Sequence, residues 1–183
     1  MTNTKSITLN SGNIINIRKN LDADIIKYWR IIRAENVMST KAKKAGKGSN
    51  YDLKALYNTI TQLQQKRIKI KGMLMYLNQG ITTFNFEEFK KTNNYSIFSA
   101  CEAKEAIAQL KLIPTINPTE KAKKGLKGTG KTETFSSAKI ASLLKNLQLE
   151  ANKFDAALEK FNTSTTITIT GTTADEFKID IAS

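Results

Sequence analysis

In two stretches of the chain, mainly apolar residues recur at alternating spacings of four and three positions, and we call each such series a seam. They predict long helices over about residues 51–78 and 136–161. The seam of the first is Leu56, Ile60, Leu63, Arg67, Ile70, Leu74 and Leu77. The seam of the second is Ile140, Leu144, Leu147, Ala151, Phe154, Leu158 and Phe161. This rhythm is the heptad spacing of helices that pack side by side, and the two seams match position for position.

Two further helices are predicted from apolar residues at helical spacing. One begins at Asp22 or Asp24 and ends near Met38. The other runs from Ser99 to about residue 112, before two prolines break the chain.

Alternation of apolar and polar residues predicts strands in three places. Residues 6–18 read as a hairpin with a turn at Gly12, residues 81–86 as a strand, and residues 165–181 as a closing hairpin. The predicted fold class is therefore α+β and mainly helical. Two αα-hairpins would form an antiparallel four-helix bundle, with short β-hairpins at the N-terminus, in the middle and at the C-terminus.

A lysine-rich octapeptide occurs twice, at residues 41–48 and 121–128, with six of eight positions identical. Each copy precedes one of the two long helices. Because repeated lysines cannot create a matching register of leucines, the pattern favours an internal tandem duplication. The predicted units are residues 1–80 and 81–183, within one compact domain.

The net charge of +13 is unevenly distributed, since residues 27–72 hold twelve Lys and Arg against only Glu35 and Asp52. Clustered positive charge predicts an anionic partner, although A/T-rich codons would also raise the lysine content. Lysine supplies a point charge, so contacts with nucleic acid should be mainly to phosphate. Tyr51 is the best candidate for stacking on a base. The predicted polyanion-binding residues are Lys41, Lys43, Lys44, Lys47, Lys121, Lys123, Lys124, Lys127, Lys131, Arg67 and Tyr51.

Residues 125–132 fit the phosphate-binding pattern G-x-x-x-x-G-K-[ST], with Lys131 and Thr132 at its end. A P-loop also requires a buried strand before the first glycine and a helix that starts at the lysine. The sequence predicts neither, so the match is interpreted as accidental.

Other chemistry has few candidates. The chain has no histidine, which excludes Ser-His-Asp and Cys-His sites and histidine-containing zinc sites. The single cysteine, Cys101, is predicted to lie in the core, and Glu102 and Glu105 on a solvated helix face. No catalytic residue, metal site or cofactor is predicted.

The compartment is predicted from three absences. A single cysteine cannot form an intramolecular disulfide, and the sequence shows neither a secretory signal nor an apolar run long enough to cross a membrane. We expect a soluble protein of the cytoplasm, or of the host cytoplasm or a virion if it is viral.

These observations favour a non-catalytic structural or accessory component of a larger assembly, such as a virion or a ribonucleoprotein. Its lysine-rich segments would contact phosphate backbone or an acidic protein surface. The alternatives are a P-loop nucleotide-binding enzyme and a small phage-type inhibitor of a host enzyme. Protein partners, DNA or RNA, and self-association are all expected possibilities, and no membrane is. Arg67 is expected at the edge of the bundle, where its replacement by leucine would not destabilise the fold.

Overall fold

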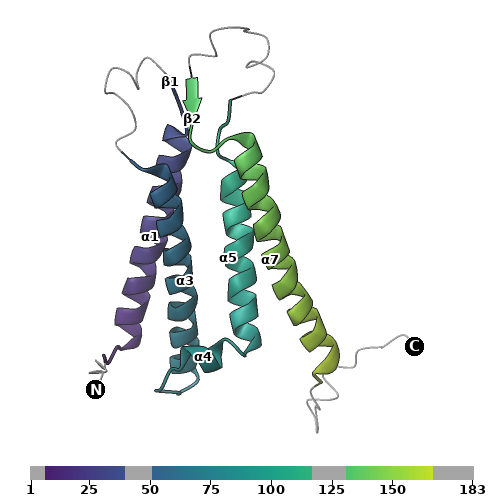
Figure 1. The fold of residues 1–183 in the computed structure, drawn as a ribbon. Helices are drawn as coiled ribbons and strands as arrows, with labels where there is room; N and C mark the ends of the chain where they lie inside the picture. Colours follow the sequence, from purple (N-terminus) through teal and green to yellow (C-terminus); the bar gives the residue numbers. More distant parts are fainter. Residues whose placement is uncertain (1–6, 40–50, 117–130, 167–183) are drawn as a thin grey trace, which may run out of the picture.

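Four long helices dominate the computed structural model, which describes residues 7–39, 51–116 and 131–166. The helices are α1 (Ser11–Glu35), α3 (Leu53–Asn78), α5 (Asn93–Lys111) and α7 (Ser137–Ser164). The chain runs up and down through them in turn (Figure 1). A short helix, α4 (Phe86–Phe89), lies between α3 and α5 at the lower end, and β1 (Val37–Ser39) pairs antiparallel with β2 (Lys131–Glu133) at the upper end. The prediction of a mainly helical protein is confirmed.

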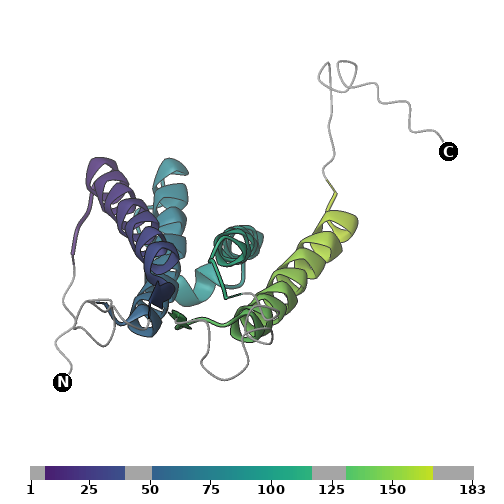
Figure 2. The same ribbon diagram turned by 90° about the horizontal axis from the view of Figure 1, so that it is seen from above.

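The long helices form two hairpins. Helix α1 packs along α3, and α5 packs along α7, whereas α3 and α5 meet over a smaller area. Helix α7 leans away from the other three toward its C-terminal end (Figures 1 and 2). Helix α7 therefore lies close to α5 at the upper end and diverges from it toward the lower end.

The predicted N-terminal β-hairpin is wrong, because Ser11 and the residues after it belong to α1. The side chain of Asn10 caps this helix by accepting a hydrogen bond from the Asn13 amide at 2.8 Å. Ile14 then lies on the same buried face of α1 as Ile25 and Trp29. Burial of that extended face makes the helix start eleven residues earlier than Asp22, which lies inside it.

The predicted strand at residues 81–86 is also wrong. Gly80, at a φ of 76°, follows the end of α3, and the Asn85 side chain then caps α4. The phenylalanines of this region form a ring cluster with tyrosines, comprising Tyr76, Phe84, Phe86, Phe89, Tyr95 and Phe98. Phe89 packs so closely on α3 that a Cβ at Gly72 would lie 2.8 Å from its ring. Aromatic packing, not strand pairing, orders the lower end.

The main apolar core lies at the upper end, where both hairpins contribute. Its buried members are Ile25, Trp29, Ile32, Leu53, Ile60, Ala106, Leu110, Ile113, Phe135 and Ile140. The predicted core position of Trp29 is confirmed, since only 1% of it is exposed. The predicted seams only partly coincide with this core, because Leu63, Leu144 and Leu147 are half-buried at its margin.

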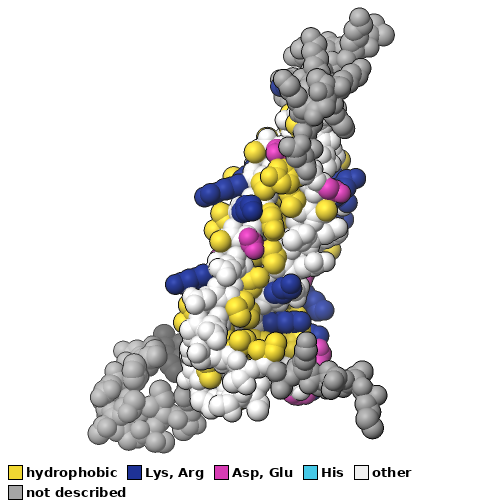
Figure 3. Space-filling view, turned by 90° about the vertical axis from the view of Figure 1, so that its left-hand side faces the viewer, with side chains coloured by type: hydrophobic (Ala, Val, Ile, Leu, Met, Phe, Trp, Pro, Cys, Tyr) yellow, Lys and Arg dark blue, Asp and Glu magenta, His cyan; other side chains and the backbone are white. Residues whose placement is uncertain are grey.

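The face shown in Figure 3 carries a stripe of hydrophobic side chains along the molecule, with Lys and Arg side chains beside it. Helix α1 contributes exposed isoleucines to the surface, including Ile15, Ile17 and Ile26. Within the described ranges, no helix combines the length and apolar character needed to cross a bilayer.

Two further predictions, the C-terminal hairpin and the tandem duplication, are not established by the described residues. The C-terminal hairpin lies almost entirely outside the described residues. The tandem duplication stays a prediction, because β1 precedes the first lysine-rich octapeptide whereas β2 follows the second, so these strands do not occupy equivalent places in the two halves.

Candidate functional site

The β1–β2 pairing brings together the two connections that contain the lysine-rich octapeptides. Ser39 lies opposite Lys131 in this two-stranded sheet. The first octapeptide begins two residues after Ser39, and the second ends three residues before Lys131. Both connections therefore leave and rejoin the described structure at its upper end (Figure 1). We call this region the lysine end.

A buried asparagine, Asn36, holds this junction together. Its Nδ2 donates hydrogen bonds to the carbonyls of Pro114 at 2.8 Å and Phe135 at 2.9 Å. Its Oδ1 accepts the amide of Phe135 at 2.7 Å, and its backbone carbonyl accepts the amide of Thr134 at 3.2 Å. One side chain thus connects the end of α1 to the segment after α5 and to the segment before α7. The sequence alone does not single out Asn36, because an isolated asparagine after a helix also fits an ordinary cap.

The predicted polyanion-binding residues lie in different places. Lys131 is exposed in β2, and 48% of Tyr51 is exposed two residues before α3 begins. The lysines of both octapeptides lie outside the described residues. Arg67 differs from all of these, because it lies in the middle of the molecule and is buried.

Arg67 is the centre of a charged network that joins α1, α3 and α5. Its guanidinium donates to Glu102 through two nitrogens, one of them at 2.8 Å, and to Asp22 at 2.8 Å and Glu105 at 2.5 Å. Lys71 also donates to Glu102 at 3.0 Å. Only 8% of the Arg67 side chain and 6% of the Glu102 side chain are exposed.

This environment changes how Arg67 must be interpreted. Burial by itself lowers the pKa of the guanidinium, but the hydrogen bonds that it donates to Glu102 and Asp22 outweigh burial and raise the pKa above its ordinary value. Arg67 is therefore a permanently charged, internally neutralised group. The expectation that it lies at an open edge is wrong, and we remove it from the polyanion-binding set.

Two neighbouring predictions on α5 are corrected as well. Glu102 is buried and not on a solvated face, because it is the main partner of Arg67. Cys101 is exposed and not in the core, since it lies beside the buried face that carries Ala100, Ala103 and Ala106. Helical spacing correctly identified the face of small residues on α5, but Cys101 lies just outside the buried part of that face.

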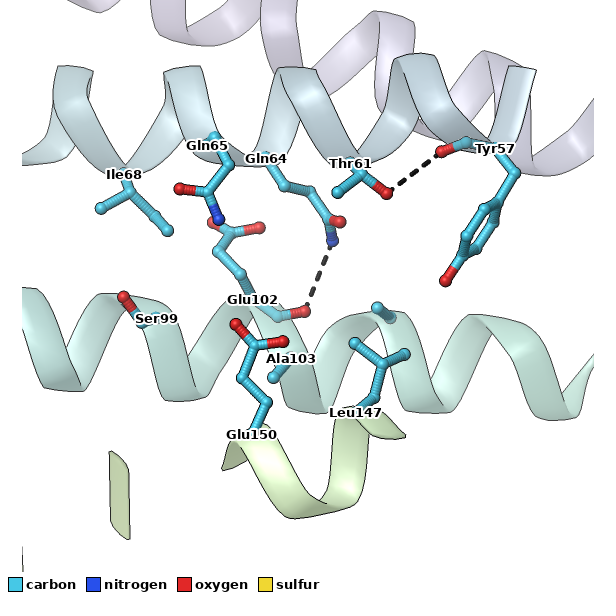
Figure 4. A pocket seen from close by; sticks show the side chains of 11 residues that line it. Tyr57, Thr61, Gln64, Gln65, Ile68, Ser99, Glu102, Ala103, Leu147 and Glu150 are labelled. Carbon is cyan, nitrogen blue, oxygen red and sulfur yellow. Dashed lines mark hydrogen bonds between the residues drawn. The ribbon is translucent and has the colours of Figure 1, made fainter. Parts of the chain in front are cut away.

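A cavity of about 90 Å³, lined by both polar and apolar side chains, lies between α3, α5 and α7, next to this network. Figure 4 shows Gln64, Glu102 and Glu150 directed toward it from three helices, with Gln64 donating to the Glu102 carbonyl at 3.4 Å. The buried Ser99 hydroxyl, which also lines the cavity, has no hydrogen-bond partner among the described residues. The pKa of Tyr57, at the cavity wall, is raised mainly by burial and to a smaller extent by the negative charge of Glu150. A space of this size and polarity suits about three water molecules.

The described part of the P-loop match lacks the required context. Lys131 and Thr132 lie in a strand, and the next helix starts only at Ser137. In a P-loop the helix begins at the lysine, so that its first amides face the phosphate. Among the described residues there is likewise no cluster of three His, Cys, Asp or Glu side chains that could hold a metal ion.

No family model, curated protein or solved structure matches this chain. A functional assignment must therefore rest on the residues themselves. The two features that stand out are the lysine end and the charged network, and the charges of the network are neutralised inside the molecule.

Proposed function

We propose that the protein is a non-catalytic component of a larger assembly, in which the lysine end contacts the phosphate backbone of a nucleic acid. The observation that supports this most is the antiparallel pairing of Ser39 with Lys131, because it roots both lysine-rich connections in one two-stranded sheet. The eight lysines of the two octapeptides would then act together from one end of the molecule. If the two segments were far apart, they would instead form two weaker positive patches.

The chemistry of the remaining side chains supports a binding role. Lysines contact phosphates without reading sequence, and the exposed ring of Tyr51 at the same end could stack on a base. The elements that join at the lysine end are held by the apolar core and by Asn36, so the binding end is attached to a rigid support. An acidic protein surface would use the same charges, and the experiment below separates the two partners.

The test is a salt titration of binding to random-sequence DNA and RNA. If several phosphates are neutralised, the logarithm of affinity falls linearly with the logarithm of salt concentration. Changing Lys41, Lys43, Lys44 and Lys47 to glutamate should weaken binding and flatten this slope. The corresponding change of Lys121, Lys123, Lys124 and Lys127 should have a similar effect, because both sets act at one end.

A matched control changes four exposed lysines outside the lysine end, namely Lys66, Lys145, Lys153 and Lys160. All three variants change the net charge by the same amount, so the control separates local contacts from the total charge of the protein. Equal weakening in all three would refute a localised binding end. Binding to polyglutamate with no affinity for either nucleic acid would assign the lysine end to an acidic protein instead.

A further inference from the structure

A second cavity, of about 290 Å³, opens at the lysine end between the first turns of α3 and α7. Its polar lining consists of Lys54, Asn58, Thr134 and Lys139. Its apolar wall consists of Tyr57, Phe135 and Leu143. The volume is at the lower limit of pockets that hold small organic ligands.

The charges of this cavity are of one sign. Lys54 and Lys139 come from different helices, both are exposed, and neither forms an ion pair with any described residue. No acidic side chain is among the described residues that line the cavity. The two lysines can therefore turn toward a ligand without breaking an existing ion pair.

The helix ends beside the cavity are already capped. The Asp52 carboxylate accepts the amides of Lys54 at 2.9 Å and Ala55 at 3.1 Å, and the Ser136 hydroxyl accepts the amide of Lys139 at 3.2 Å. A ligand would thus be held by the lysine ammonium groups and the Asn58 and Thr134 side chains, not by free helix amides.

Contacts with other aromatic rings hold the apolar wall of the cavity in place. The ring of Tyr57 lies 5.9 Å from those of both Trp29 and Phe135, between centroids, and Phe135 is buried. A tyrosine hydroxyl is already protonated at neutral pH, and burial together with Glu150 raises the pKa of Tyr57 further, so this wall is uncharged. An anionic ligand with a flat apolar part would match both the two lysines and this wall.

We propose that this cavity binds one nucleotide of a nucleic-acid strand, with the phosphate between Lys54 and Lys139 and the base against the wall formed by Tyr57, Phe135 and Leu143. The inference rests on the proposed function and adds a defined subsite to it. An acidic peptide fits less well, because a carboxylate side chain would satisfy the lysines but leave the apolar wall uncovered.

The experiment uses the full chain and amide NMR titrations with a nucleoside monophosphate, the matching nucleoside and inorganic phosphate. The monophosphate should shift the Thr134 and Lys139 amides saturably, and it should bind more tightly than either of its two parts. Changing Lys54 and Lys139 together to glutamate should weaken it at least about tenfold, as expected for loss of charge-assisted contacts. The neutral pair Lys54→Met and Lys139→Met should weaken it in the same direction.

The matched control changes Lys66 and Lys153, which lie on the same two helices but outside the cavity, to glutamate. It should alter affinity by less than about twofold, because exposed charges at a distance are screened by salt. Thermal unfolding of every variant checks that the fold is retained.

Three results would overturn the inference. One is equal affinity for inorganic phosphate and the monophosphate, because the wall would then hold no base. Another is competition by hexaglutamate as strong as that by the monophosphate, which would indicate an acidic peptide. The third is the absence of saturable shifts. If random DNA or RNA still bound with its salt dependence, any of these would reject the nucleotide subsite and leave the proposed function standing.

Discussion

Two of the regions where the helical hairpins meet differ in their chemistry. At the upper end the junction is apolar, with Trp29, Ile60 and Leu110 almost completely buried. In the middle it is ionic, with Arg67 surrounded by Asp22, Glu102 and Glu105. Apolar burial is non-directional, so it stabilises many ways of packing helices, whereas a guanidinium with three carboxylates is satisfied in few geometries.

This difference suggests a division of roles. The upper region supplies most of the stabilising burial, and we infer that the central network selects the relative register of α1, α3 and α5. Buried ionic groups add little net stability compared with apolar residues, but removing one partner is costly. The following predictions test this comparison, beginning with the largest expected effect.

Arg67→Leu should destabilise the protein by about 3 to 5 kcal/mol, because among the described residues it leaves the buried carboxylate of Glu102 with Lys71 alone as a partner. Urea unfolding measures the change. Adding Glu102→Leu should restore most of the lost stability, since an apolar pair can replace a buried ion pair. A single mutant as stable as the wild type would mean that the network is not buried in solution, as the sequence pattern by itself suggested.

Ile60→Ala, in the apolar region, should cost about 2 to 5 kcal/mol through lost burial and a residual cavity. No second substitution of a neighbour to alanine should rescue it, in contrast to the central network. Leu147→Ala, at the half-buried margin, should cost less, and the two values can be compared in the same unfolding experiment. Equal costs would show that the second seam is as deeply buried as the first.

Asn36→Ala should cost about 1 to 3 kcal/mol, because the carbonyl of Pro114 and the amide and carbonyl of Phe135 would lose their buried partner. Asn36 is thus a buried polar residue within the otherwise apolar upper region. Asn78→Ala, at an exposed position in α3, is the control and should have little effect. Hydrogen exchange of the Thr134 and Phe135 amides should also become faster in the Asn36 variant alone.

Tyr57→Phe should have the smallest effect, visible only at alkaline pH. The pKa of Tyr57 is raised in the folded protein, so the unfolded chain loses this proton first. The unfolded state then binds fewer protons, and stability falls as pH rises beyond about 10, the ordinary tyrosine value. The phenylalanine variant should lack this part of the loss when unfolding is compared between pH 9 and 11. Identical pH profiles would place the Tyr57 hydroxyl in water.

The sequence by itself determined two of the four long helices and part of the core. The four-three heptad patterns placed α3 and α7 within a few residues of their observed bounds, because those patterns persist over many turns. Over residues 14–18, by contrast, Ile15 and Ile17 alternate with polar residues as in a strand, while Ile14 continues the helical face of Ile25. Only contact with α3 decides between the two periods, since it buries Ile14 in a helix.

The charged residues show the same limit more sharply. The sequence placed the lysines in two similar segments, but it could not show that both segments join the described structure at the same end, because the pairing of Ser39 with Lys131 joins residues far apart in the chain. It also grouped Arg67 with the surface lysines, since a lone arginine in a seam has no local feature that reveals its partners. Those partners come from two other helices, and only their convergence in the tertiary structure provides enough carboxylate oxygens to bury a guanidinium.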